Sequence, residues 1–123
     1  MMSTKQVQLA EFYGGVYHLS NVLLRNISVY TALLYQREPN NALVSCIFLA
    51  NMVKEQGLVI NTPPEGEALR KRLLEFAAGQ EAFLRALIAG NLAAAQNVVA
   101  SQQEDAQLFV LDLQQFREST GLV

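Results

Sequence analysis

The sequence predicts an all-α protein: an antiparallel up-down-up-down four-helix bundle with a long first helix that carries a candidate kink. Three observations predict this fold. Apolar residues recur at three- and four-residue steps over long stretches, which is the period of an amphipathic helix. Glycine and proline fall between these stretches and divide the chain into four segments. The connectors are only a few residues long, so consecutive helices should lie antiparallel and side by side.

The first helix is expected from Thr4 to Gln36. Its apolar stripe covers half of the circumference or more, which is wider than the ~100° of an ordinary surface helix, so it should contact at least two neighbours. Gly14-Gly15 interrupts the stripe, and each glycine in a helix interior costs about 1 kcal/mol relative to alanine. The pair therefore marks a kink, a close helix crossing or the true start of the helix. The stripe comprises Leu9, Phe12, Val16, Leu19, Leu23, Ile27, Tyr30 and Leu34.

The second and third helices are delimited by proline and glycine. A turn over 37–40 contains Pro39, and the second helix should run from there to about Gln56, with Gly57 as its C-terminal stop. Thr62-Pro63-Pro64-Glu65 has the pattern of a capping box: a threonine cap, a proline in the first turn and an acid three residues after the cap. The third helix should run from this box to Ala89.

The fourth helix is expected to begin at once after the third. Gly90 should end one helix, Asn91 should cap the next, and Gly121 should end it after about Ser119. The four helices are unequal in length. A first helix of about 33 residues would extend past a second of about 16 by roughly 25 Å. That overhang needs a partner, either the bent start of the same helix or a second subunit.

Composition limits the class of protein. The 123 residues fit a single domain, 1–123, and 16% of them are charged, against about 25% in a typical domain. The net charge of −2 gives no reason to expect a nucleic-acid partner. The single cysteine, Cys46, excludes a disulfide within the chain and suits a reducing compartment. The apolar run Ala42–Val53 is too short to span a bilayer. We therefore expect a cytoplasmic protein with no membrane partner.

The second helix is the candidate for an interface. Between Ala42 and Val53 only Ser45 and Asn51 are polar, and a helix that is apolar all round is usually buried all round. The functional prediction is a protein-protein interface, most simply that of a homodimer. The alternative is that the first helix bends over this helix and buries it within one chain. The residues of the predicted interface are Phe48, Met52, Ser45 and Leu49.

Two further hypotheses concern the first helix. A glycine notch beside an aromatic ring could line a small-molecule cleft, with Gly14, Tyr17, His18, Asn21 and Arg25 as its residues. The stretch from His18 to Ile27 also resembles the phosphoacceptor helix of histidine-kinase dimerisation domains, in which an asparagine follows an exposed histidine by three residues. That resemblance implies phosphotransfer through His18, the only histidine. No acidic residue follows His18 directly, and an ordinary solvent-facing histidine is the alternative.

Polar residues on the apolar stripes predict buried amides. Gln80 lies on the stripe of the third helix, Gln102 or Gln103 on that of the fourth, and Asn26 near the edge of the first. Buried amides need partners, and they can fix the register between helices or line a polar pocket. No Glu-x-x-His pair, zinc-ligand set or glycine-rich phosphate loop occurs in the sequence. We therefore expect no cofactor and no metal, and a protein that is not an enzyme.

Overall fold

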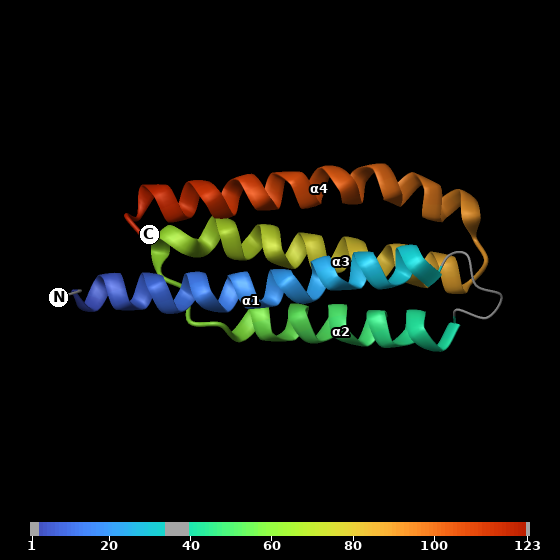
Figure 1. Cartoon of the computed structure of the whole chain (residues 1–123), viewed down its shortest axis with the longest axis horizontal. Helices are drawn as coiled ribbons and strands as arrows, with labels where there is room; N and C mark the ends of the chain where they lie inside the picture. Colours follow the sequence, from blue (N-terminus) through green and yellow to red (C-terminus); the bar gives the residue numbers. More distant parts are fainter. Residues whose placement is uncertain (1–2, 34–39, 123) are drawn as a thin grey trace.

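The computed structural model describes residues 3–33 and 40–122. Four α-helices make up this part of the chain, and it contains no strand, so the predicted all-α four-helix class is confirmed. Each helix runs opposite to the one before it, and the chain ends where it began, at one end of the molecule (Figure 1). The predicted end of the first helix at Gln36 and most of the turn over 37–40 fall outside the described residues. The elements are α1 (Thr4–Leu33), α2 (Asn40–Val59), the short 3₁₀ helix η1 (Pro64–Gly66), α3 (Glu67–Ile88) and α4 (Leu92–Ser119).

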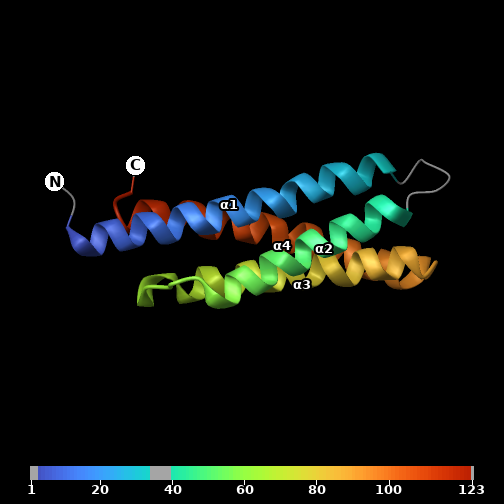
Figure 2. The same ribbon diagram turned by 90° about the horizontal axis from the view of Figure 1, so that it is seen from below.

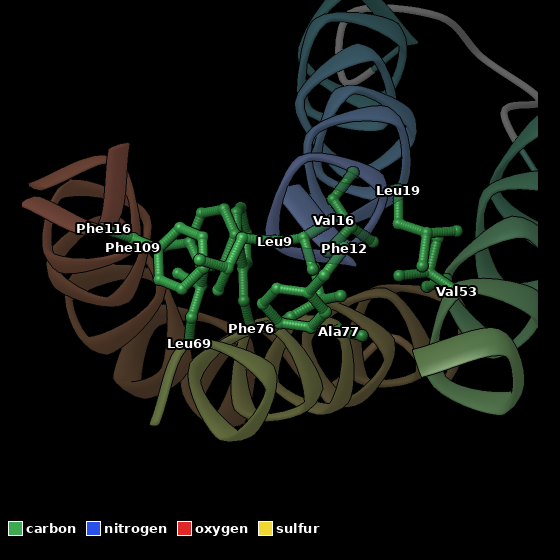
Figure 3. Packing of buried hydrophobic residues seen from close by; sticks show 13 residues of the cluster. Leu9, Phe12, Val16, Leu19, Val53, Leu69, Phe76, Ala77, Phe109 and Phe116 are labelled. Atoms are coloured by element: carbon green, nitrogen blue, oxygen red, sulfur yellow. The ribbon is translucent and has the colours of Figure 1, made fainter. Parts of the chain in front are cut away.

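The hydrophobic core receives side chains from all four helices. Figure 3 shows Phe109 of α4 on one side of this cluster and Val53 of α2 on the other, beside Leu19 of α1. Phe12 of α1 and Phe76 of α3 lie between them. A smaller second cluster occupies the other end of the bundle. It is formed by Tyr30, Leu43, Cys46, Phe83 and Leu84.

α1 is one continuous helix through Gly14-Gly15, so the glycine pair is neither its start nor a break in it. The two glycines have different surroundings. Gly14 faces open space, whereas a Cβ added at Gly15 would lie 2.8 Å from the Cδ1 of Ile60. Gly15 therefore permits a close approach of the Ile60 side chain from the segment that follows α2, which is a contact with a loop residue and not the helix crossing considered from the sequence.

The N-terminal part of α1 extends beyond the end of α2 and lies beside the C-terminal part of α4 (Figures 1 and 2). The overhang is about 15 Å, because α1 has 30 residues and α2 has 20. The rings of Phe12 and Phe116 meet edge to face at 5.5 Å between centroids. Lys5 forms a 2.9 Å ion pair with Glu65 of η1. The chain therefore covers part of this overhang itself, at Leu9 and Phe12, while residues 3–8 are exposed.

The connection between α2 and α3 differs from the prediction. α2 continues through Gly57 to Val59, so the prediction that Gly57 ends the helix is wrong. A Cβ at Gly57 would lie 3.0 Å from the Cδ2 of Leu74, which shows that this glycine serves close packing against α3. The predicted capping box is also wrong. The hydroxyl of Thr62 donates to the carbonyl of Ile60, and η1 separates it from the first residue of α3.

The connection between α3 and α4 is as predicted. Gly90 has a φ of 75°, the left-handed conformation that ends a helix and that glycine adopts at little cost. The side-chain oxygen of Asn91 accepts the backbone N–H of Ala94 at 3.0 Å and caps α4. Gly121 has a φ of 72° and follows the end of α4.

Candidate protein interface on the second helix

α2 packs against α1 on one side and α3 on another, and its remaining face is open to solvent. Phe48 is the most exposed large side chain in its middle, with 72% of its surface accessible. Val44, one turn earlier, is 54% exposed, and Val59, at the end of the helix, is 83% exposed. A phenyl ring exposed to this extent at the centre of an apolar helix is the kind of surface at which proteins associate.

The other predicted interface residues fall in different places. Ser45 is exposed, and its hydroxyl donates to the backbone carbonyl of Asn41, so it is tied to its own helix. Leu49 is at the edge of the open face, 38% exposed. Met52 is half-buried and packs against the main core cluster. The centre of the open face is therefore Phe48 with Val44, and Met52 belongs largely to the core.

A shallow hollow of about 430 Å³ lies between α2 and α3, directly beside Phe48. α2 contributes one wall and the last turns of α3 the other. The lining is apolar apart from Asn51 and Arg85. Its full lining is Val44, Ile47, Phe48, Asn51, Arg85, Ile88 and Ala89.

Charged groups at the edge of this hollow neutralise one another. Glu81 of α3 accepts two hydrogen bonds from Arg85, at 2.9 and 3.1 Å, and pairs with Lys54 of α2 at 3.4 Å. Burial alone would raise the pKa of the Glu81 carboxyl, but the hydrogen bond from Arg85 and the charge of Lys54 lower it. Glu81 is therefore ionised at neutral pH. With Glu55, exposed on α2, two acids balance two bases at this surface.

The residues of the predicted small-molecule cleft lie elsewhere. All five are exposed, and within the described part of the chain only Arg25 of the five lines a hollow, one of about 280 Å³ between α1 and α2 that Ser45 and Leu49 also line. His18 is one of the five exposed residues, as expected for a solvent-facing histidine. The five are Gly14, Tyr17, His18, Asn21 and Arg25.

Buried amides connect the helices between the two core clusters. The Asn26 amide nitrogen donates to the side-chain oxygen of Gln80 at 2.8 Å and to the backbone carbonyl of Cys46 at 2.9 Å. The Gln80 amide nitrogen donates to the carbonyl of Leu23 at 2.9 Å. This cluster joins α1, α2 and α3. The sequence predicted that these amides are buried, but it did not predict which groups they would meet.

A second buried polar contact joins α1 and α4. The Tyr30 hydroxyl donates to the side-chain oxygen of Gln102 at 3.4 Å, and the Gln102 amide nitrogen is buried with no hydrogen-bond partner among the described residues. Burial, with a smaller contribution from the charge of the Cys46 thiolate, raises the pKa of Tyr30 to about 12. Of the two glutamines considered for α4, Gln102 is the buried one and Gln103 is exposed.

Neither a metal site nor a reactive thiol adds to these features. In residues 3–33 and 40–122, no group of three or more His, Cys, Asp or Glu side chains is placed to hold a metal ion. Cys46 is buried, and burial raises the pKa of its thiol. The thiol therefore stays protonated near neutral pH and packs as a small apolar group.

α2 meets the length and composition criteria for a membrane-spanning helix. The stretch Asn41–Val59 has 19 residues and a mean hydropathy of 1.3, so the prediction that the apolar run is too short does not hold for the whole helix. Core helices of bundles meet the same criteria. In this structure α2 packs against α1 and α3, and Lys54 within the stretch pairs with Glu81 of α3.

Comparison with known proteins identifies no relative: no family model, no curated protein and no solved structure matches this chain.

Proposed function

We propose that this chain is a non-enzymatic association protein that binds a protein partner, in the first place a second copy of itself, through the open face of α2. The observation that carries the proposal is Phe48, a ring 72% exposed at the centre of a helix whose other sides are packed in the bundle. The low fraction of charged residues supports it, because the centres of protein interfaces are depleted in charged residues. The small, mainly apolar hollow beside Phe48 gives this face a recess in which a partner side chain can pack.

The two alternatives predicted from the sequence have less support. A small-molecule cleft on α1 would need Tyr17 and its neighbours to enclose a volume, and among the described residues only Arg25 of the five lines a hollow. Phosphotransfer through His18 requires an exposed histidine, which the protein has, but exposure alone is common to most surface histidines. Neither alternative explains why an aromatic ring is exposed on α2.

Phe48→Asp tests the proposal. Covering the exposed part of a phenyl ring contributes about 2–3 kcal/mol, and a carboxylate in its place would also have to be desolvated. We expect the dimer dissociation constant to rise at least about 100-fold, since 2.7 kcal/mol corresponds to that factor. The fold should persist, because the side chain makes little contact with its own chain. Sedimentation velocity measures the mass, and circular dichroism checks the helix content.

Leu111→Asp is the matched control. Leu111 is 53% exposed on α4, away from α2, so the same chemical change there should leave self-association unaltered. If both variants dissociate alike, general surface hydrophobicity and not the α2 face drives association. If Phe48→Asp stays dimeric, the proposed interface is wrong.

A further inference from the structure

The hollow between α2 and α3 lies at the same position along the bundle axis as the Phe48 ring. Its α2 wall comes from Val44, Ile47, Asn51 and Phe48 itself, so the hollow is centred on the level of the ring. Its α3 wall comes from Arg85 and its neighbours. The exposed Phe48 ring therefore borders the hollow, which opens from the ring toward α3 at the same level along the bundle.

We propose that the occupant of this hollow is the Phe48 ring of a second copy, in a dimer whose two-fold axis runs parallel to α2. This rests on the proposed function, because it specifies how the two copies meet. The two α2 helices then run in the same direction, side by side. Each Phe48 enters the hollow between α2 and α3 of the other subunit.

Symmetry selects this arrangement. A two-fold axis parallel to the helices leaves the position of each residue along the bundle axis unchanged. It also places the α2 side of one subunit opposite the α3 side of the other, so each Phe48 ring meets the partner's hollow. A two-fold axis across the helices, centred on Phe48, reverses their direction but keeps the sides. It would place Phe48 against Phe48 of the partner subunit and leave both hollows empty. Only the parallel arrangement fills them.

Size and charge agree with a ring from a second copy. A cavity of about 150 Å³ is enough to bind benzene, so a hollow of about 430 Å³ accepts a phenyl ring with room for part of the helix that carries it. The guanidinium of Arg85 lines the hollow and can lie against the ring face. Its charge is already balanced by Glu81, and the face as a whole balances two acids with two bases. Two identical copies of this face therefore meet without a net like-charge repulsion.

The available area is in the range of a real but modest dimer. α2 is about 30 Å long and each helix is about 10 Å wide, so the α2 and α3 surfaces together offer a footprint of roughly 600 Å². Specific interfaces bury about 800 Å² on each partner, and weak ones somewhat less. The two helices thus supply an area below that of a standard specific interface and in the range of a weak dimer.

Paired labels on α2 determine the direction of the helices in the dimer. Asn41 and Glu55 are both exposed and lie seven residues before and after Phe48. In the parallel dimer, Asn41→Cys and Glu55→Cys should each give a short distance between identical positions, close to the 8–10 Å between packed helices. In the antiparallel dimer both distances become about 23 Å, because fourteen residues of helix rise, about 21 Å, then separate the two positions along the axis. Dipolar line broadening in continuous-wave electron paramagnetic resonance reports the short distances, and pulsed measurements report the long ones.

Filling the hollow is the second test. Ala89 is exposed at its α3 edge, so Ala89→Trp should occupy the hollow without altering α2. We expect self-association to weaken at least about 10-fold while the helix content is unchanged. Glu104→Trp, exposed on α4, is the control and should have no effect. Because Cys46 is buried, labels attach only at the introduced cysteines.

The outcomes separate the two proposals. Short distances at both label positions, with association lost in Ala89→Trp, support the inference. A dimer with long distances at both positions, or one that Ala89→Trp does not weaken, overturns the inference and leaves the proposed function standing. A wild-type chain that stays monomeric at every concentration overturns both.

Discussion

Gln80→Met removes both hydrogen bonds that this amide makes in the core while keeping a side chain of similar shape. Gln80 accepts from Asn26 and donates to the carbonyl of Leu23, and it is fully buried. Each buried hydrogen bond contributes about 1 kcal/mol net. One N–H of Asn26 is also left without an acceptor, which costs about 1–3 kcal/mol. Burial of the apolar methionine side chain offsets part of this cost, so we expect the free energy of unfolding to fall by about 2 kcal/mol.

The loss can be measured by urea unfolding followed by far-ultraviolet circular dichroism. For a chain of 123 residues, 2 kcal/mol corresponds to a fall in Tm of about 8 °C. All variants must be compared at one protein concentration, because self-association stabilises the folded state by mass action.

The double variant Asn26→Leu with Gln80→Met distinguishes a coupled pair from two independent residues. When both partners become apolar, no donor or acceptor is left unpaired. The double variant should therefore be more stable than the sum of the single changes predicts, by about 1–2 kcal/mol. If the stability loss of the double variant equals the sum of the two single losses within about 0.5 kcal/mol, the two residues are not coupled. That result would also refute the role of this pair in joining α1 to α3.

Two further predictions concern packing and pH. Gly66→Ala should destabilise the fold by about 1–3 kcal/mol, because the new Cβ would clash with the buried Phe12 ring. Gly14→Ala, where nothing lies within 4 Å, should instead stabilise α1 by up to about 1 kcal/mol. Chemical denaturation measures the free energy of unfolding of both variants. Equal changes in the two variants would contradict the packing of Phe12 against Gly66. The raised pKa of Tyr30, about 12, means that the folded state holds this proton more tightly than the unfolded state, whose pKa is near 10. Its contribution to stability is complete below pH 10 and is lost between pH 10 and 12, by up to about 3 kcal/mol. Tyr30→Phe should flatten the stability profile over that interval, and an unchanged slope would contradict the assignment.

Local chemistry explains which parts of the fold could be predicted from the sequence. The boundary at Gly90 and Asn91 was predictable because a left-handed glycine and an amide cap act within one turn of the chain. Gly57 and Thr62 were misinterpreted because tertiary contacts override the local signal. Gly57 lies inside a helix since Leu74 packs on it, and Thr62 lies before a 3₁₀ turn and not at a helix start.

The candidate interface was only partly predictable for the same reason. Periodicity placed Phe48 and Met52 on one face of the second helix, but how far α1 covers that face depends on how the helices pack. α1 and the core reach Met52 and leave Phe48 open. The hollow beside Phe48 has walls from two helices, so no pattern within one segment could indicate it. The partner groups of Gln80 likewise depend on the register between α1 and α3.

The mass of the wild-type chain in solution tests association through α2 most directly. Sedimentation velocity over a micromolar concentration series should show a species of twice the 13.6 kDa of one chain, which dissociates on dilution. A single 13.6 kDa species throughout the series would contradict the proposal that a second copy of the chain covers the exposed face of α2.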